Sequence, residues 1–157
     1  MNNPKRTVEQ VTKAVADILE RDYDSVIKNW YARIEKNQEL ASLPIAFEKR
    51  TFYLHKLIQD LVVRLRLPTD ALPIASEAAR EHGRSRAMLG YTIPMLIEES
   101  RYLQVSIFEV LEKHLSSEES SVVLKSIMTI ADEVDSQLKQ MLESYLDAEP
   151  KNMLRIA

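Results

Sequence analysis

Apolar residues recur along most of this chain at steps of three and four, the spacing that places them on one face of an α-helix. The first such run extends from about Thr7 to Asn37, and Thr7 with Gln10 forms a capping box at its start. Further runs extend from about Phe47 to Leu65 and from about Pro73 to Leu89. The proline-containing segment between those two runs is expected to be a loop.

Two more helices are predicted in the second half of the chain. Thr92 can cap the fourth helix, and Pro94 fits its first turn, where a missing N–H costs nothing. Gly90, just before it, suits the left-handed conformation that often follows a helix end. The fifth helix is expected from about Ser117 to Ala148, with Pro150 ending it. At roughly 45 Å it is longer than a domain of this size needs.

The fold class that follows from these patterns is all-α. With 2 glycines in 157 residues, the chain has too few turn signals for an all-β fold. We therefore predict a bundle of about five main helices, with long first and last helices, in one domain over residues 1–148. Residues 149–157 are expected to be a tail or the start of a linker.

Composition narrows the classes of function. The net charge is -3, from 24 acidic and 21 basic residues, and no segment is strongly basic, so the electrostatic footprint of a nucleic-acid-binding protein is missing. The chain has no cysteine, which excludes a thiolate nucleophile and a zinc–thiolate site. No apolar run is long enough to span a membrane and the start is not a signal peptide, so we expect a soluble, cytoplasmic protein.

Motifs for catalysis and metal binding are also missing from the sequence. There is no Gly-x-Ser-x-Gly elbow and no glycine-rich loop before a helix. The three histidines, His55, His82 and His114, fall on different predicted helices, and none forms the Glu-x-x-His pair of diiron bundles. No catalytic residue and no metal site is therefore expected, and the protein is not expected to be an enzyme.

The most polar segment, "EHGRSRAMLGYTIPMLIEESRYL" over residues 81–103, joins the third and fourth predicted helices. His82 falls on the small-residue face of its helix, so it is expected to be partly buried, either as a hydrogen-bonded core residue or as a ligand or pH-sensing group. Glu99 lies near the buried face of the next helix, where a carboxylate needs a partner. We expect it to contact His82 or one of the two nearby arginines. The candidate ligand or signal residues are His82, Arg84, Arg86, Tyr91, Glu99 and Tyr102.

This segment resembles the N-terminal sensing domain of RsbR-type proteins, the stressosome co-antagonists and the bacterial sensor histidine kinases that share the domain. The likeness extends from about residue 10 to residue 148. The matching positions are His82-Gly83, an arginine at Arg84 or Arg86, Gly90-Tyr91, and then Leu96, Glu99, Leu103 and Ile107.

The resemblance implies a globin-like helical fold, usually homodimeric, fused ahead of an output module such as a STAS domain or a histidine kinase. Domains of this type are regulatory rather than catalytic, and those of the stressosome group are regarded as lacking haem. The sequence stops at Ala157 and contains no output module of either type. The chain is therefore expected to be either a piece of a longer protein or a standalone sensing domain.

The predicted last helix suggests how a signal could leave the domain. Its apolar positions alternate steps of three and four, which gives a seam that a second copy of the chain could cover. We therefore expect a homodimer through the first and last helices, with a stimulus at the segment 81–103 shifting the last helix. The candidate seam residues are Val134, Leu138, Met141 and Tyr145.

Three classes of function remain open from the sequence. The first is a regulatory sensor domain, which responds to an unidentified small molecule. It acts on an output domain in cis or on a partner signalling protein. The second is a haem- or other cofactor-binding globin-like sensor with His82 as its ligand, although no cofactor is expected. The third is a helical adaptor or scaffold for protein partners.

Overall fold

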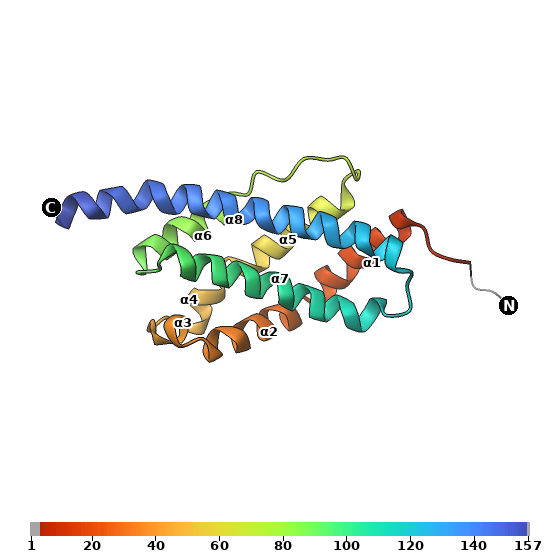
Figure 1. The fold of residues 1–157 in the computed structure, drawn as a ribbon, viewed down its shortest axis with the longest axis horizontal. Helices are drawn as coiled ribbons and strands as arrows, with labels where there is room; N and C mark the ends of the chain where they lie inside the picture. Colours follow the sequence, from red (N-terminus) through yellow and green to blue (C-terminus); the bar gives the residue numbers. More distant parts are fainter. Residues whose placement is uncertain (1–3, 157) are drawn as a thin grey trace.

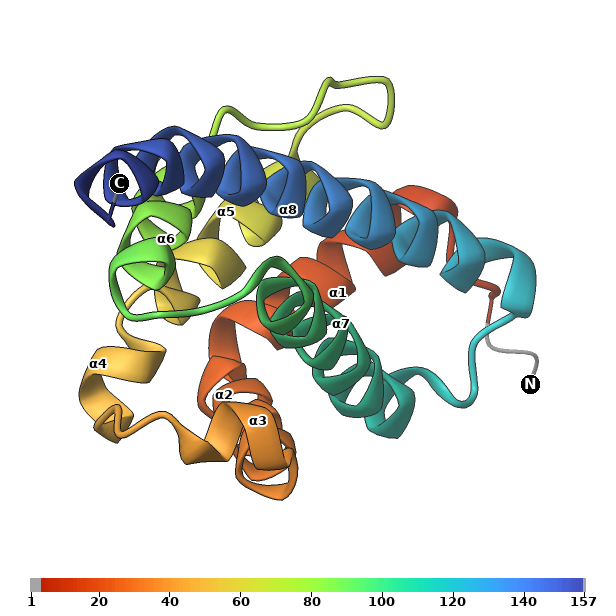
Figure 2. The same ribbon diagram turned by 60° about the vertical axis from the view of Figure 1, so that its left-hand side comes forward.

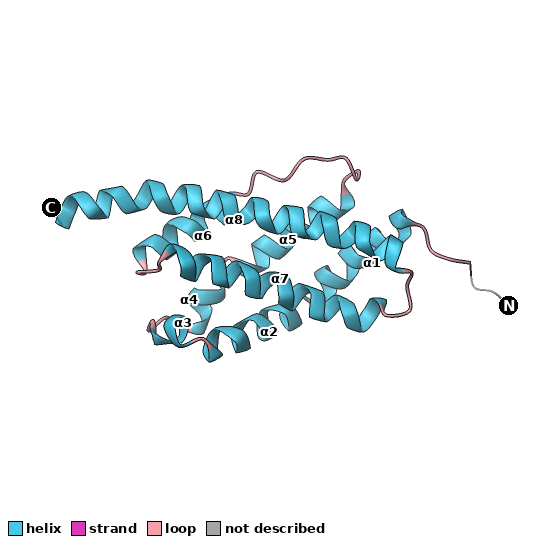
Figure 3. Cartoon of the chain, viewed as in Figure 1, coloured by secondary structure: helices cyan, strands magenta, loops and turns pink. Residues whose placement is uncertain are grey.

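The secondary structure of the described residues is entirely helical (Figure 3). The computed structural model describes the backbone of residues 4–156 and the side chains of residues 4–148. No β-strand occurs in this part of the chain, so the all-α prediction is confirmed. In chain order the helices are α1 (Val8–Arg21), α2 (Tyr23–Lys36), α3 (Gln38–Ser42), α4 (Phe47–Thr51), α5 (Leu54–Arg66), α6 (Glu77–Met88), α7 (Ile93–Leu115) and α8 (Ser120–Ile156).

A break at Asp22 divides the predicted first helix into α1 and α2. Asp22 has φ -109° and ψ 22°, and its N–H closes the last turn of α1 on the carbonyl of Ile18. After the break α2 packs on α7, whereas α1 packs mainly on α5 and α8. The prediction of one long helix was wrong because the apolar spacing continues across Asp22 and no glycine or proline marks the break.

The second and third predicted helices are also shorter than expected. A turn at Phe52 and Tyr53 separates α4 from α5. Helix α6 begins at Glu77 rather than at Pro73, and the Ser76 side chain caps it by accepting the N–H of Ala79 at 3.0 Å. The expected number of about five main helices therefore does not describe this fold.

In the described part of the chain, no helix has both the length and the apolar character needed to cross a bilayer.

The apolar core runs through the whole bundle. Trp30 adds a polar link to the core, because its indole N–H donates to the carbonyl of Glu99 at 3.0 Å and so ties α2 to α7. Core side chains that are at most 1% exposed include Val15, Leu19, Trp30, Leu57, Leu61, Leu96, Ile107 and Ile130.

Helix α8 lies along the whole of one side of the bundle (Figures 1 and 2). It packs on α6, α1, α7 and α5. It continues to Ile156, so the prediction that Pro150 ends it is wrong. A proline removes one backbone hydrogen bond and often kinks a helix, but it does not oblige the chain to leave the helix. The C-terminal end of α8 projects beyond α6 (Figure 1).

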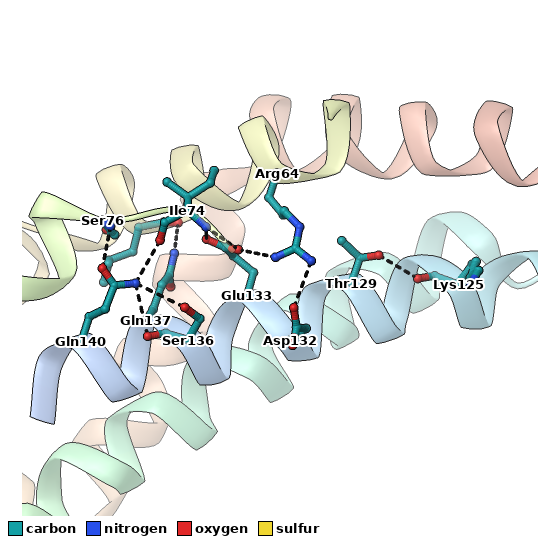
Figure 4. A network of polar contacts seen from close by, with 11 residues as sticks. Arg64, Ile74, Ser76, Lys125, Thr129, Asp132, Glu133, Ser136, Gln137 and Gln140 are labelled. Carbon is teal, nitrogen blue, oxygen red and sulfur yellow. Dashed lines mark hydrogen bonds and ion pairs between the residues drawn. The ribbon is translucent and has the colours of Figure 1, made fainter. Parts of the chain in front are cut away.

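The buried face of α8 carries polar side chains that hold the loop of residues 67–76 (Figure 4). The fully buried carboxylate of Glu133 accepts from the Arg64 guanidinium at 2.8 Å and from the N–H of Ile74 at 3.2 Å. Burial raises the pKa of Glu133 although Arg64 opposes that shift. The side-chain oxygen of Gln140 accepts from the N–H of Ser76 at 2.7 Å. These bonds explain why residues 73–76 are not part of α6.

Two further polar contacts fix α8 against the first half of the chain. The Gln137 amide donates to the carbonyl of Leu57 in α5 at 2.9 Å, and the hydroxyls of Ser126 and Thr12 lie 3.2 Å apart. Both α8 side chains are 1% exposed. Because these groups are buried and bonded to different helices, they favour one axial position of α8.

Two glycines allow the close packing and sharp turn around α6. A Cβ atom added to Gly83 would lie 2.0 Å from the carbonyl oxygen of Met141, so α6 and α8 are in backbone contact there. Gly90 has φ +87°, which confirms the left-handed residue predicted just past the helix end. The elbow between α6 and α7 is therefore defined by one close contact and one turn.

Replacing Gly83 by alanine is expected to lower the free energy of unfolding by about 2 kcal/mol, since the added methyl group must separate α6 from α8. Helix propensity alone would give the opposite sign, a gain of up to about 1 kcal/mol. Urea denaturation of both proteins measures the difference. The control is Arg84→Ala at the exposed neighbouring position, expected to change stability by less than about 0.5 kcal/mol. A stabilised Gly83→Ala protein would contradict the backbone contact.

Candidate functional site

The candidate site is a group of buried charged and phenolic side chains at the elbow between α6 and α7. We call it the elbow cluster, and its members share exposures of 3% or less. They come from α4, α6, the α6–α7 turn, α7 and α8. The elbow cluster consists of Arg50, His82, Arg86, Tyr91, Glu99 and Tyr145.

Its centre is the ion pair between Arg86 of α6 and Glu99 of α7. The Arg86 Nε atom donates to Glu99 Oε1 at 3.0 Å, and a terminal nitrogen of the same guanidinium donates to Oε2 at 3.3 Å. The exposed fractions are 0% for Arg86 and 3% for Glu99. The predicted contact of Glu99 with an arginine of the preceding helix is confirmed.

His82 contacts the same carboxylate from one turn earlier on α6. Its Nε2 atom lies 3.2 Å from Glu99 Oε1, and its ring meets Tyr53 edge-on at a centroid distance of 5.8 Å. Burial, and then the positive charge of Arg86, lower the pKa of His82 below its usual value. The imidazole is therefore neutral, and the contact with Glu99 assigns its proton to Nε2. The prediction that His82 is buried is confirmed.

Tyr91 adds a hydroxyl to the second oxygen of the carboxylate. Its O–H donates to Glu99 Oε2 at 2.8 Å, and the Arg86 guanidinium lies 4.9 Å from the centre of its ring. Burial, and then the charge of Glu99, raise the pKa of Tyr91 far above its usual value. The phenol is thus a hydrogen-bond donor and not a base or nucleophile.

Arg50, which was not predicted from the sequence, brings a second buried guanidinium to the elbow cluster. One terminal nitrogen donates to the Tyr91 hydroxyl at 3.0 Å, and the other donates to the carbonyls of Leu40 and Leu43 at 3.0 Å. The Arg50 carbonyl in turn accepts from Arg86 at 2.6 Å. No periodic signal marks Arg50, because α4 is too short to show one.

These neighbours keep Glu99 ionised inside the protein. Burial alone would raise its pKa, but Arg86 and His82 together outweigh burial and lower the pKa of Glu99 to about 2. The carboxylate accepts four hydrogen bonds, two of them from Arg86. A buried carboxylate with this many donors is a fixed negative charge around which its neighbours are oriented.

Tyr145 connects α8 to the elbow cluster. Its hydroxyl donates to the backbone carbonyl of Tyr91 at 2.5 Å. Tyr145 is 3% exposed and lies in the chain's own core, as do Val134 at 3% and Met141 at 4%. Leu138, the fourth residue of the predicted seam, is half-buried. The prediction that this face of α8 is open to a second copy is therefore wrong, because the same chain covers it.

Two of the six candidates lie outside the elbow cluster. Arg84 is exposed on α6. Tyr102 is half-buried on α7, and its hydroxyl accepts from the side-chain amide of Asn37 at 3.0 Å. It lines an open polar hollow of about 530 Å³ between the α2–α3 corner and α7. Four of the six, His82, Arg86, Tyr91 and Glu99, meet at one carboxylate.

His82 lies in a closely packed part of the core. Its Nε2 atom lies against Glu99, its Nδ1 atom is buried without a hydrogen-bond partner among the described residues, and the next residue, Gly83, touches the α8 backbone. A haem ligand needs an imidazole nitrogen that faces a wide apolar cavity, so a haem at His82 would require these helices to separate. In the described residues, no group of three histidine, aspartate or glutamate side chains is placed to hold a metal ion. The elbow cluster connects four helices and a turn to one another.

Replacing Glu99 by glutamine is expected to lower the free energy of unfolding by about 3 kcal/mol, because it leaves the buried Arg86 guanidinium without its counter-charge. Urea denaturation at pH 7 measures the loss. The matched control is Glu98→Gln, since Glu98 pairs at 2.6 Å with Arg101, whose side chain is 63% exposed. That change is expected to cost less than about 1 kcal/mol. Equal effects of the two substitutions would contradict the central role of the Glu99 ion pair.

The stability of the wild-type protein is expected to fall as the pH is lowered from 6.5 to 2. Glu99 has a folded pKa of about 2 against an ordinary value of 4.5, so its contribution of about 3 kcal/mol is complete above pH 4.5 and is lost as the pH falls towards 2. The pKa of His82 is lowered from 6.5, so its contribution also decreases below pH 6.5. Denaturation at successive pH values should show the gap between wild type and Glu99→Gln closing below pH 4.5. A gap that stays constant down to pH 2.5 would contradict the lowered pKa.

Comparison of the whole chain with protein-family models, with curated proteins and with solved structures finds no match. The resemblance to the RsbR-type sensing domain therefore remains a prediction from the residues of the elbow and its flanking helices.

Proposed function

We propose that this chain is a regulatory signal-input domain, without catalytic activity, in which a stimulus alters the elbow cluster and thereby the position of α8. The observation that supports the proposal most is the hydrogen bond from Tyr145 to the Tyr91 carbonyl. This bond joins the elbow cluster directly to α8, the helix that projects from the bundle (Figure 1).

The coupling follows a short series of contacts. Glu99 on α7 binds the Tyr91 hydroxyl, and the backbone of Tyr91 binds Tyr145 on α8. On the other side of Glu99, Arg86 belongs to α6, which touches the α8 backbone at Gly83. A rearrangement around the carboxylate would therefore reach α8 at two places, separated by one turn of that helix.

In this proposal the elbow cluster has two states. A stimulus shifts a protein between states only when it interacts more favourably with one of them. A buried ion pair suits this role, because its complete form is stable while a form that has lost one partner is not. The stimulus in this proposal is an unidentified small molecule or a partner protein.

The proposal also takes from the RsbR-type resemblance a globin-like arrangement of the helices and an output module at the end of α8. The length of α8 supports this second point, since it extends to Ile156 and projects past α6. The output would be a STAS domain or a histidine kinase in cis, or a separate signalling partner.

A homodimer in this proposal needs a different surface from the predicted seam. Exposed apolar side chains near the elbow provide one, with Ile93 at 37%, Ile97 at 37% and Leu146 at 49% exposed. Ile93 and Leu146 line the same hollow of about 500 Å³ between the elbow and α8. A helical adaptor for protein partners would use the same surface, and it is the second candidate function.

Tyr145→Phe is expected to change the position of the C-terminal half of α8, because it removes the hydroxyl that binds the elbow. Because the chain has no cysteine, spin labels can be placed by introducing cysteines at the exposed positions Glu35 and Asp147. Double electron–electron resonance should then show a displaced or broadened distance, by roughly 2–5 Å. Labelled protein is diluted with unlabelled protein to suppress distances between copies.

The control pair of labels is Glu35 with Lys125, which is exposed near the start of α8. That distance is expected to be the same in both proteins. If Tyr145→Phe remains folded by circular dichroism and the distance from Glu35 to Asp147 is unchanged, the elbow does not position α8 and the proposed function fails.

A further inference from the structure

A second site lies beside the turn that joins α7 to α8. This turn is at the opposite end of α7 from the elbow (Figure 1). The site is a cavity of about 360 Å³ between α1, α7 and α8. This volume is within the range of small-molecule pockets in proteins. Its apolar lining consists of Val15, Phe108, Leu111, Leu115, Val123 and Ile127.

The floor of this cavity is part of the core and offers no free polar group. Val15 is 0% exposed, Leu111 is 4% exposed and Leu115 is 6% exposed. Ser126 also lines the cavity, but its hydroxyl lies 3.2 Å from that of Thr12. A ligand body that enters this floor must therefore be apolar.

The rim of the cavity carries one carboxylate, Glu112, which is exposed. Among the described residues it has no ion-pair partner, and no basic residue lines the cavity with it. Four other acidic side chains at this end of the bundle are paired with basic ones. The pairs are Glu109 with Arg33, Glu118 with Arg6, Glu119 with Lys5, and Asp22 with His114.

We propose that this cavity binds a small amphiphile with an aliphatic body and a cationic head, of the primary alkylammonium class. The body would occupy the apolar floor, and the ammonium group would remain hydrated at the rim beside Glu112. At the roughly 30 Å³ that a water molecule occupies in the liquid, the cavity has room for about a dozen non-hydrogen atoms. An alkyl chain of about eight carbons with one nitrogen fits within that limit.

The site is independent of the proposed signalling role. It shares no residue with the elbow cluster, and binding would be observed whether or not α8 moves. A failure of the binding experiment leaves the spin-label experiment unaffected, and the reverse also holds.

Isothermal titration calorimetry of the whole chain at pH 7, with octylammonium chloride and with 1-octanol, tests the proposal. Both are expected to bind one molecule per chain. Glu112→Gln should weaken octylammonium binding by about three- to five-fold, the size expected for an exposed ion pair, and leave 1-octanol unchanged. The control is Glu35→Gln, which removes an exposed carboxylate from α2 and should change neither ligand.

A second pair of variants locates the ligand. Val123→Phe fills the cavity and should abolish binding of both ligands, whereas Val63→Phe, at an exposed position on α5, should not. Methyl NMR shifts of Val15, Leu111 and Val123 during titration of the wild type give the same information if Val123→Phe does not fold.

Three results would overturn the proposal. The first is no binding of either ligand at concentrations up to about 1 mM, an affinity well within what nine non-hydrogen atoms can supply. The second is binding that survives Val123→Phe or that moves no methyl signal of the cavity. The third is an equal change in the affinities of octylammonium and 1-octanol on Glu112→Gln, which would show that Glu112 does not recognise the cationic head.

Discussion

The ion pair between Glu99 and Arg86 is the contact on which the arrangement of the elbow depends. Two charges that are almost fully buried need hydrogen bonds from the protein, because each has lost its hydration. The Tyr91 hydroxyl and the Arg50 carbonyl, from the turn after α6 and from α4, supply two of them, while one terminal nitrogen of Arg86 has no hydrogen-bond partner among the described residues. Trp30 adds α2 through the Glu99 carbonyl. Five segments of the chain are therefore placed by one carboxylate and the backbone that carries it.

Much of this arrangement could be predicted from the sequence, for identifiable physical reasons. Capping residues and Gly90 mark the ends of helices, because they satisfy backbone groups or adopt a left-handed conformation locally. The Glu99 contact was predictable because a carboxylate near a buried face needs a partner. Arg50 was not predictable, since its partners are carbonyls that only the folded chain brings to it. The break at Asp22 was missed because it follows from packing on two different neighbours rather than from a local breaker.

The error about α8 has a more general cause. A helix with apolar residues at steps of three and four has a face that must be covered, but the spacing is the same whether the cover is a second copy or the chain's own helices. Val134, Met141 and Tyr145 are covered by the chain itself. The polar residues Glu133, Gln137 and Gln140 among them were the available signal. Each is bonded to a specific group on another segment, which a seam between identical helices would not provide.

Those polar contacts determine what kind of motion α8 can make. Intermediate positions would leave several buried groups of α8 and their partners unpaired at the same time. A gradual slide is therefore unfavourable at every small displacement, and only an arrangement in which the groups find new partners could compete with the present one. A stimulus of the proposed kind would therefore not change the size of the displacement of α8. It would change only the fraction of molecules in each position, so each molecule would switch between two positions while the average over the population would change gradually.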